Sequence, residues 1–444
     1  MHFFPTFLLS LPAVQASLAS PWASLNRGVG ARHKPVARSL VDRRTSPPIV
    51  PDVALSWYAG WHAANLTPAE VSWEKYSVIT FAFVVTTPDI SELSVAKEDD
   101  ATLRQLVALG HRSNTSVLAT IGGWTGSMYF STSVATEQNR TKFVAAINNI
   151  VKEYQLDGVD IDWEYPDSKG IGCNTLSASD TANFLEFLKE LRASELKDKF
   201  ITASTAIKPF LDASGNPLRN VSEFADVLSW IHLMVYDIWG SWSPTTGPNA
   251  PLNDSCVATT PQSAGSAVSA VQAWTEAGFP LEKLVLGVPS YGHSFTVYNA
   301  DAFQKGSTTD LVDSFRPFNA SATPFGDSWQ SGPGLDACGN LQGNSGEYDF
   351  WAMIQLGLLD ENGLPVSGTP NIFDTCSQTP SIYITSSNTW IEYDDPRSFK
   401  AKGEFIRQKG LKGFAMWEAA GDWDDLLLDA IREGAGFPNT PCHP

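Results

Sequence analysis

The chain has 444 residues, of which 43% are hydrophobic and 18% charged, and its formal net charge is −18. This composition is typical of a globular protein, and beyond the N-terminal segment no run of 18 or more apolar residues predicts a membrane-spanning helix. The acidic balance disfavours nucleic acids and anionic membranes as partners, because both bind basic surfaces, and it favours a neutral or cationic ligand.

The N-terminal segment is typical of a protein that enters the secretory pathway. Residues 1–19 combine an apolar stretch with small residues at its end, which predicts a signal peptide; a short buried helix interrupted by two prolines is the alternative. Residues 20–50 are basic and rich in proline and serine, and we expect a propeptide or disordered leader there. Without residues 1–50 the chain keeps 24 basic and 47 acidic residues, a net charge of −23.

Sequons for N-glycosylation support the same localisation. Six N-x-S/T triplets occur, at Asn65, Asn114, Asn139, Asn220, Asn253 and Asn319. Six such sites together with a signal peptide predict a secreted, extracellular glycoprotein.

Eight short segments rich in β-branched or aromatic residues are predicted strands, and amphipathic segments lie between them. The strands are expected at 53–58, 77–84, 116–121, 158–164, 200–205, 228–236, 283–289 and 412–418, with helices such as 141–155 and 181–195 between them. Strands that alternate with helices favour an α/β fold with a parallel sheet, and eight strands can close a (β/α)8 TIM barrel. A doubly wound open sheet is the alternative.

The regular spacing breaks after the seventh strand, where about 120 residues precede the eighth. This connection is much longer than a usual crossover, so we expect a small inserted α+β domain at the barrel mouth. Its start is loop-like, residues 346–359 predict a helix, and residues 381–395 predict two strands around an SSN turn. The predicted organisation is a catalytic barrel of residues 51–291 and 378–437, an insertion of residues 292–377 whose last strands extend to about 393, and a tail of residues 438–444.

Five cysteines also suit an oxidising compartment. They stand at positions 173, 256, 338, 376 and 442 and lack the C-x-x-C spacing of a zinc or redox site. They allow two disulfides and one free thiol. We favour a bond between Cys338 and Cys376, because both fall in the predicted insertion.

The fourth predicted strand carries the most informative segment, DGVDIDWEYP at 157–166. Side chains alternate along a strand, so Asp160, Asp162 and Glu164 share one face at intervals of roughly 6.5 Å, while Trp163 packs on the other face. Glu164 falls at the carboxyl end of the strand, where barrel active sites are built. Asp157 has the opposite parity and is predicted to be structural.

Carboxyl groups this close cannot all ionise at low cost, so we expect at least one shared proton and one raised pKa. A carboxyl group with a raised pKa can act as a general acid near neutral pH. A solvated acidic strand or a divalent-metal site is the alternative, but hard cations usually also take ligands from loops and carbonyl groups. We therefore expect no metal and no cofactor.

This segment resembles the DxxDxDxE motif of family 18 glycoside hydrolases, the chitinases. Four further segments are similar to motifs of that family in the same order: TIGGW (120–124), LMVYD (233–237), LVLGVPSYG (284–292) and GFAMWE (413–418). The predicted insertion, which closes with YDDPRSFKAK (393–402), is also similar to the α+β insertion of one chitinase subgroup. The resemblance covers residues 52 to 437.

The resemblance implies a mechanism in which the substrate supplies the nucleophile. Glu164 would protonate the glycosidic oxygen while the 2-acetamido oxygen attacks C1. Asp162 would hold the acetamido N–H and stabilise the oxazolinium intermediate, and Asp160 would share a proton with Asp162. Tyr236 would donate its hydroxyl to the acetamido oxygen.

The resemblance and the affinity of aromatic rings for sugar faces also imply substrate-binding residues. Trp417 is expected to form the floor of the pocket for the cleaved sugar, and weaker contacts are expected from Trp124, Asp237, Met234, Tyr58 and Tyr291. Packing in the core is the alternative for each aromatic residue. Two positions depart from the family pattern: His293 stands where many relatives carry arginine, and Thr120 replaces serine.

Three functions remain open. The first is a retaining chitinase that cleaves β-1,4-linked N-acetylglucosamine polymers. The second is a chitin-binding lectin, which is disfavoured because Glu164 is present. The third is an endo-β-N-acetylglucosaminidase acting on N-glycans, which is disfavoured because an insertion deepens a groove and so suits a linear polymer. The expected partner is chitin or a chitooligosaccharide, bound by a monomer, with no nucleic acid or membrane.

Overall fold

A computed structural model describes residues 53–254, 264–330 and 332–438 of the chain. The predicted signal peptide and leader lie outside these residues, as do Cys256 and Cys442. No helix within the described ranges combines the length and the hydropathy needed to cross a bilayer.

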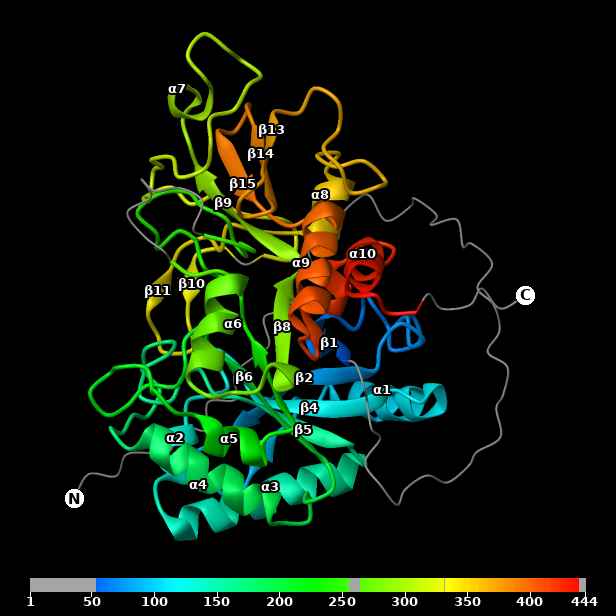
Figure 1. The fold of residues 1–444 in the computed structure, drawn as a ribbon, viewed down its shortest axis with the longest axis vertical. Coiled ribbons are helices and arrows are strands. Elements are labelled where there is room, and N and C mark those ends of the chain that lie inside the picture. The colour runs from blue at the N-terminus through cyan, green and yellow to red at the C-terminus, as the bar shows by residue number, and fades with distance from the viewer. Residues whose placement is uncertain (1–52, 255–263, 331, 439–444) are drawn as a thin grey trace, which may run out of the picture. The chain divides into compact units, whose positions relative to one another are not determined.

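Eight parallel strands form a closed barrel (Figure 1). They are β1 (Val53–Ala59), β2 (Val78–Thr86), β4 (Ser116–Gly122), β5 (Gly158–Asp162), β6 (Phe200–Thr205), β7 (Trp230–Leu233), β8 (Leu284–Pro289) and β16 (Gly413–Trp417). The order β1-β16-β8-β7-β6-β5-β4-β2 closes because β1 also pairs with β2, with Leu55 opposite Val78. The predicted TIM barrel is confirmed, and the open sheet is excluded. A short strand, β3 (Leu93–Ser94), extends β2 in antiparallel fashion.

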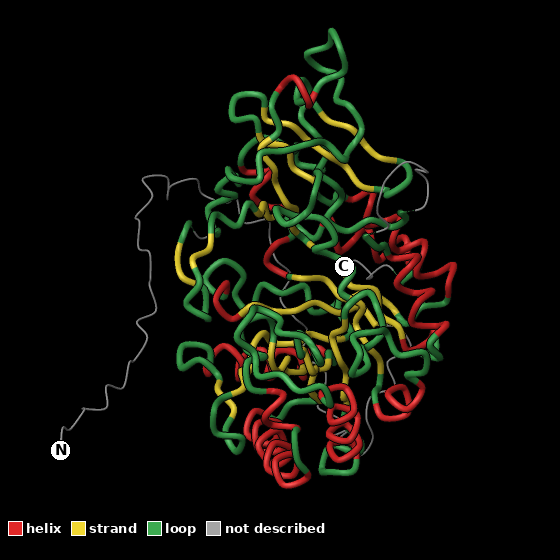
Figure 2. The backbone as a smooth tube through the Cα atoms, turned by 90° about the vertical axis from the view of Figure 1, so that its left-hand side faces the viewer, coloured by secondary structure: helices red, strands yellow, loops and turns green. Residues whose placement is uncertain are grey.

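Helices follow the strands and surround the barrel, and the tube in Figure 2 shows them outside the strands. They are α1 (Asp100–Ser113), α2 (Phe130–Val134), α3 (Glu137–Tyr154), α4 (Asp180–Arg192), α5 (Ser222–Val227), α6 (Ala267–Glu276), α9 (Pro396–Lys409) and α10 (Leu426–Ala435). Local sequence sets the ends of α9: Asp395 caps its first turn, proline occupies the first position, and Gly410 ends it in the left-handed region. The helices predicted at 141–155 and 181–195 are α3 and α4.

The outer faces of the strands build the main core against these helices. Trp163, just beyond β5, is 2% exposed and stacks on Phe130 with ring centroids 5.2 Å apart. Asp157 lies outside the acidic row, as predicted. Its carboxylate accepts the N–H of Val117 at 2.8 Å and contacts His111. It therefore fixes the start of β5 against β4.

A second, antiparallel sheet follows β8, in the order β12-β9-β15-β14-β13. Its strands are β9 (Tyr291–Thr296), β12 (Glu347–Asp349), β13 (Asn371–Asp374), β14 (Thr379–Ile384) and β15 (Thr389–Glu392), with helices α7 (Asn299–Ala302) and α8 (Phe350–Gln355) in the same segment. The predicted strand pair around the SSN turn is β14–β15. This pair belongs to the second sheet, so the sheet of the insertion ends at Glu392. That end lies beyond residue 377, the predicted boundary, and agrees with the expectation that the last strands extend to about 393.

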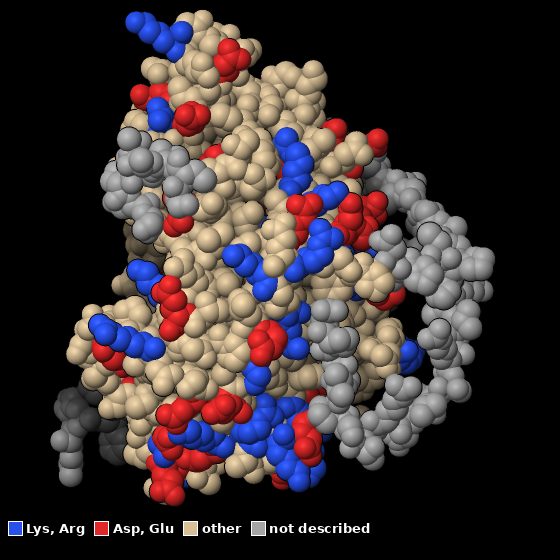
Figure 3. Space-filling model, viewed as in Figure 1, with Lys and Arg blue, Asp and Glu red and all other residues tan. Residues whose placement is uncertain are grey.

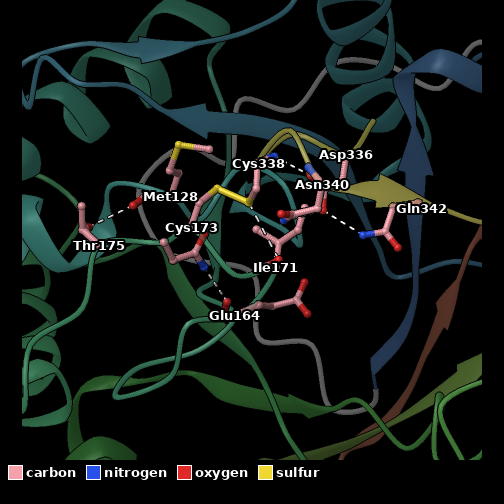
Figure 4. Close-up of a disulfide and its surroundings, with 10 residues drawn as sticks. Met128, Glu164, Ile171, Cys173, Thr175, Asp336, Cys338, Asn340 and Gln342 are labelled. Carbon is pink, nitrogen blue, oxygen red and sulfur yellow. Dashed lines mark hydrogen bonds between the residues drawn. A yellow bond between two sulfur atoms is a disulfide. The ribbon is translucent and has the colours of Figure 1, made fainter. Parts of the chain in front are cut away.

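The predicted Cys338–Cys376 disulfide is wrong. Cys338 lies in a hairpin formed by β10 (Gly334–Leu335) and β11 (Leu341–Gln342) and is bonded to Cys173, with the Cα atoms 5.6 Å apart. Cys376 is also disulfide-bonded, and because Cys338 is already paired with Cys173, the partner of Cys376 is a different cysteine. Figure 4 shows the bond beside Ile171, close to the main chain of Glu164. The bond thus joins the insertion to the loop after β5 and not two parts of the insertion.

Candidate active site

The three predicted acids form a row along β5 that leads from the barrel interior to its mouth. Asp160 is fully buried, Asp162 is 5% exposed, and Glu164 lies two residues beyond the end of the strand with its side chain partly exposed. Two side chains hold the main chain of Glu164. Its N–H donates to Ser127 Oγ at 3.1 Å, and its carbonyl accepts from Asn174 Nδ2 at 2.9 Å.

Asp160 is surrounded by hydrogen-bond donors. Thr202 Oγ1 donates to Oδ1 at 2.7 Å, and Oδ2 accepts from Ser204 Oγ at 2.9 Å and from Thr120 Oγ1 at 3.2 Å. Burial alone would raise the pKa of Asp160, but His232 and the hydroxyls of Thr202 and Ser204 lower it below its usual value. Asp160 is therefore the member of the row whose surroundings favour the ionised form.

Asp162 has the opposite environment. Its buried Oδ1 has no hydrogen-bond partner among the described residues. Burial, together with the charges of Glu164 and Asp160, raises the pKa of Asp162 well above its usual value. Of the two buried carboxyl groups, Asp162 is therefore the one whose surroundings favour the neutral form. The proton predicted to be shared between Asp160 and Asp162 stays a prediction.

Glu164 is suited to donate a proton near neutral pH. Burial raises its pKa to about 7, the charge of Asp237 acts in the same direction, and a hydrogen bond with Tyr165 opposes them. A general acid is most effective when its pKa lies near the working pH. The pKa values of the three acids are therefore shifted differently by their different surroundings.

Tyr236 follows β7 and lies against β8. A Cβ atom at Gly287 would come within 3.1 Å of its ring and 2.3 Å of the carbonyl of Leu233, so glycine is required there. Burial and the charges of Asp162, Asp237 and Glu164 raise the pKa of Tyr236 well above its usual value. Its hydroxyl therefore remains protonated and available as a donor.

Asp237 is the centre of a second polar group at the mouth. Its Oδ1 accepts from Tyr291 Oη at 2.6 Å and lies 2.8 Å from His293 Nε2. The Asp237 side chain is 49% exposed, whereas that of His293 is 4% exposed. The structure thus brings together Tyr236, Asp237 and Tyr291 as predicted, with His293 behind them.

Aromatic side chains line the barrel mouth beside the acids. Trp417 stacks on Phe83 at 5.4 Å, and Phe83 stacks in turn on Trp61 at 5.9 Å. Trp61 is 54% exposed and Trp124 is 49% exposed. The sequence prediction included Trp417 and Trp124 but not Trp61 or Phe83, although the GW pair directly after the first strand is the pattern that points to Trp61.

The predicted sugar contact by Tyr58 is wrong. Tyr58 is 1% exposed, and its hydroxyl donates to the carbonyl of Leu66 at 2.6 Å. Its ring belongs to the core between the strands and the outer helices, because its neighbour Trp57 takes the interior face of β1. Met234 is partly buried just after β7. Among the described residues, no three His, Cys, Asp or Glu side chains converge on a position for a metal ion.

The model of glycosyl hydrolases family 18 matches residues 54–422, a range that includes the whole acidic row. The chain belongs to family 18. It is 48% identical over 388 residues to a chitinase-like effector of Moniliophthora roreri, which covers 87% of this chain and 94% of that protein. It is 27% identical to Chitinase A1 of Niallia circulans over 72% of this chain and 42% of that protein.

The same family contains solved structures that are similar over nearly their whole length. The crystal structure of a chitinase (RmChi1) from Rhizomucor miehei aligns with a TM-score of 0.76 and 32% identity, covering 86% of this chain and 99% of that one. The resemblance read from the sequence motifs is thereby confirmed. Family 18 membership and these chitinase relatives support a glycoside hydrolase of the chitin-degrading type.

Proposed function

We propose that this protein is a secreted, monomeric chitinase that cleaves β-1,4-linked N-acetylglucosamine chains with retention of anomeric configuration. The observation that carries the proposal is the state of Glu164: a partly exposed carboxyl group with a pKa of about 7, at the end of a row of two other acids. Hydrolysis by substrate assistance requires such an acid together with a neighbour that stabilises the reacting acetamido group.

The site supports a sequence of steps. Glu164 donates its proton to the glycosidic oxygen while the acetamido oxygen of the sugar attacks C1, which breaks the C1–O bond and forms an oxazolinium ion. Asp162 accepts the acetamido N–H, and Tyr236 donates its hydroxyl to the acetamido oxygen. Water, deprotonated by the Glu164 carboxylate, then attacks C1 from the side of the departed sugar and restores the acetamido group. Two inversions at C1 leave the β configuration unchanged.

The aromatic surface supports a sugar polymer as the substrate. Trp417, Phe83 and the exposed Trp61 form a continuous stack that begins at the end of β16, and apolar faces of sugar rings pack on such surfaces. A class V chitinase from Nicotiana with a Glu-to-Gln substitution is described in complex with NAG4. An oligosaccharide of N-acetylglucosamine is therefore the ligand with which to test this chain.

A second candidate is a protein that binds chitin fragments and cleaves them slowly or not at all. It is favoured by the description of the 48% identical Moniliophthora roreri protein as a chitinase-like effector. The presence of Glu164 favours the enzyme. An endo-acting glycosidase on N-glycans would share the mechanism and differ in its substrate.

The deciding experiment is hydrolysis of the N-acetylglucosamine hexasaccharide by the wild type and by Glu164→Gln, with anomers resolved at early time. We expect β-anomeric products and a loss of turnover of at least about 10²–10⁴-fold in the variant, with binding preserved. Asp157→Asn is the matched control, since it changes an acid of the same segment outside the row. Binding without cleavage by the wild type would favour the second candidate, and cleavage of N-glycans alone would favour the third.

A further inference from the structure

A histidine that the mechanism above does not use lies in the barrel interior beside the acidic row. His232, on β7, is fully buried, and its Nδ1 lies 3.4 Å from Oδ1 of Asp160, whose side chain is also fully buried. The strand register explains this position, because His232 is level with Ser204 on β6 and Thr202 is level with Asp160 on β5. A buried histidine needs a partner for each ring nitrogen.

The neighbouring tryptophan decides which ring nitrogen of His232 carries the proton. The indole N–H of Trp230 lies 2.6 Å from His232 Nε2, and an indole nitrogen can only donate. His232 Nε2 is therefore an acceptor and carries no proton. The single ring proton of a neutral imidazole must then be on Nδ1, the nitrogen that faces Asp160.

The contact with Asp160 is electrostatic in character. A separation of 3.4 Å is at the long limit for a hydrogen bond, and Nδ1 makes no hydrogen bond of good geometry among the described residues. A small movement of Asp160 toward His232 would complete the bond. The ring itself is held in place, because Trp57 packs edge-on against it at 5.2 Å and Trp230 holds its other side.

We propose that His232 is a positioning residue of the acidic row, which presents its Nδ1–H to Asp160 and so orients and stabilises that carboxylate. The inference deepens the proposed function, on which its catalytic part rests. Asp160 is fully buried, so its carboxylate depends on neighbouring side chains for hydrogen-bond donors. His232 then supplies a donor without adding a positive charge that would oppose the oxazolinium ion.

Few other ionisable groups act on this pair. Asp162 is the acidic neighbour on the same strand, and the charge of Asp160 acts on it directly. From the side of β16, the ammonium group of Lys412 lies 5.8 Å from the ring centroid of Trp230. The side chains that face Asp160 from β4 and β6 are the hydroxyls of Thr120, Thr202 and Ser204, which do not titrate in this range.

The activity test compares His232→Leu, which removes the donor, with His232→Asn, whose amide N–H replaces Nδ1–H at nearly the same position. For the leucine variant we expect kcat on the hexasaccharide to fall by about 10-fold or more with little change in KM. The acidic limb of its kcat/KM profile should move to higher pH by roughly one unit, as on loss of one donor to a charged group. The asparagine variant should restore both.

A second measurement tests the ring without catalysis. In ¹⁵N spectra of histidine-labelled wild type, His232 should show a protonated Nδ1 and an unprotonated Nε2. In Trp230→Phe, which keeps the histidine and releases Nε2, the proton should no longer be confined to Nδ1. If His232→Leu does not fold, Trp230→Phe takes its place as the variant that tests the inference.

The outcomes separate this inference from the proposed function. A wild-type ring that carries its proton on Nε2 overturns the inference whether or not the protein cleaves chitin. An unshifted acidic limb in His232→Leu overturns it as well. If the wild type does not cleave the hexasaccharide, the proposed function fails, while the ring spectrum still decides whether His232 is the donor to Asp160.

Discussion

The pKa values of the three acids in the row differ because their neighbours differ, and the role of each acid can be tested one residue at a time. Asp162 is the member with an unpartnered buried oxygen, which a substrate N–H can satisfy. Its contacts are proposed to strengthen as the oxazolinium ion forms, so Asp162→Asn should lower kcat by about 10²-fold and change KM little. Steady-state kinetics on the hexasaccharide measures both. An unchanged kcat with a raised KM would assign Asp162 to binding alone.

The alkaline limit of activity should follow Glu164. A general acid must be protonated, so kcat/KM should fall as pH rises through the pKa of Glu164, about 7 in the free enzyme. The charge of Asp237 contributes to this raised pKa, after burial. Asp237→Asn should therefore move the alkaline limb to lower pH, by up to about one unit. A limb that stays in place would remove Asp237 from the electrostatics of the acid.

Alternation along a strand predicted Asp160, Asp162 and Glu164 on one face, because their parity shows in the sequence. It did not show that Tyr58 points away from the barrel interior. Both faces of β1 are apolar, so the segment SWY does not indicate which side chain lies inside the barrel. It also missed His232, whose importance depends on the register that brings β7 level with β6 and so places the ring beside Asp160. Contacts between strands distant in sequence set these roles.

At the scale of elements, the Cys173–Cys338 bond joins the hairpin of β10 and β11 to the loop after β5. The loop carries Asn174, whose side chain holds the carbonyl of Glu164. The sequence could not give this pairing, because the two cysteines are separated by 165 residues and the fold of the insertion was unknown. The predicted pair rested on both cysteines falling in the insertion, which is a poor guide when a hairpin of the insertion folds back toward the barrel.

Removal of this bond should affect both stability and turnover. Loss of a native disulfide typically costs about 2–5 kcal/mol, and a loop this long favours the upper end of that range for the free energy of unfolding of Cys173→Ala with Cys338→Ala. Turnover should also fall, because the segment that positions Glu164 loses its anchor. Denaturant unfolding and hexasaccharide hydrolysis measure the two effects. Leu341→Ser, at an exposed position of the same hairpin, is the control and should change stability by less than about 0.5 kcal/mol.

For the whole molecule, the number and spacing of apolar segments were enough to predict the barrel. The extent of the second sheet was harder to read, because β9 follows β8 after one residue and β15 lies about 90 residues later, yet the two pair directly. The net charge of the molecule follows directly from the sequence.

On the face shown in Figure 3, acidic and basic side chains lie beside one another. The excess of acidic residues over the whole chain is large.

Stability should fall as pH rises from about 4.5 to 7. Glu392 on β15 is fully buried, where it accepts from Ser381 Oγ and Trp390 Nε1, and burial raises its pKa from 4.5 to about 7. In the unfolded chain this group ionises near 4.5. Between these values the unfolded state therefore binds fewer protons than the native state, and the free energy of unfolding decreases with pH. Repulsion among the excess acidic groups acts in the same direction.

Carboxyl groups with a lowered pKa do not reverse this trend. The usual pKa of an aspartate is 3.8, and that of Asp160 is lowered in the folded protein. Asp160 therefore stabilises the fold above pH 3.8, and this contribution is lost only as the pH falls below that value. Calorimetry between pH 4.5 and 8 at constant salt should therefore show Tm decreasing. Glu392→Gln keeps the shape of the side chain and cannot ionise, so its Tm should match the wild type near pH 4.5 and exceed it near pH 8. Parallel curves for the two proteins would show that Glu392 is already ionised in the native state.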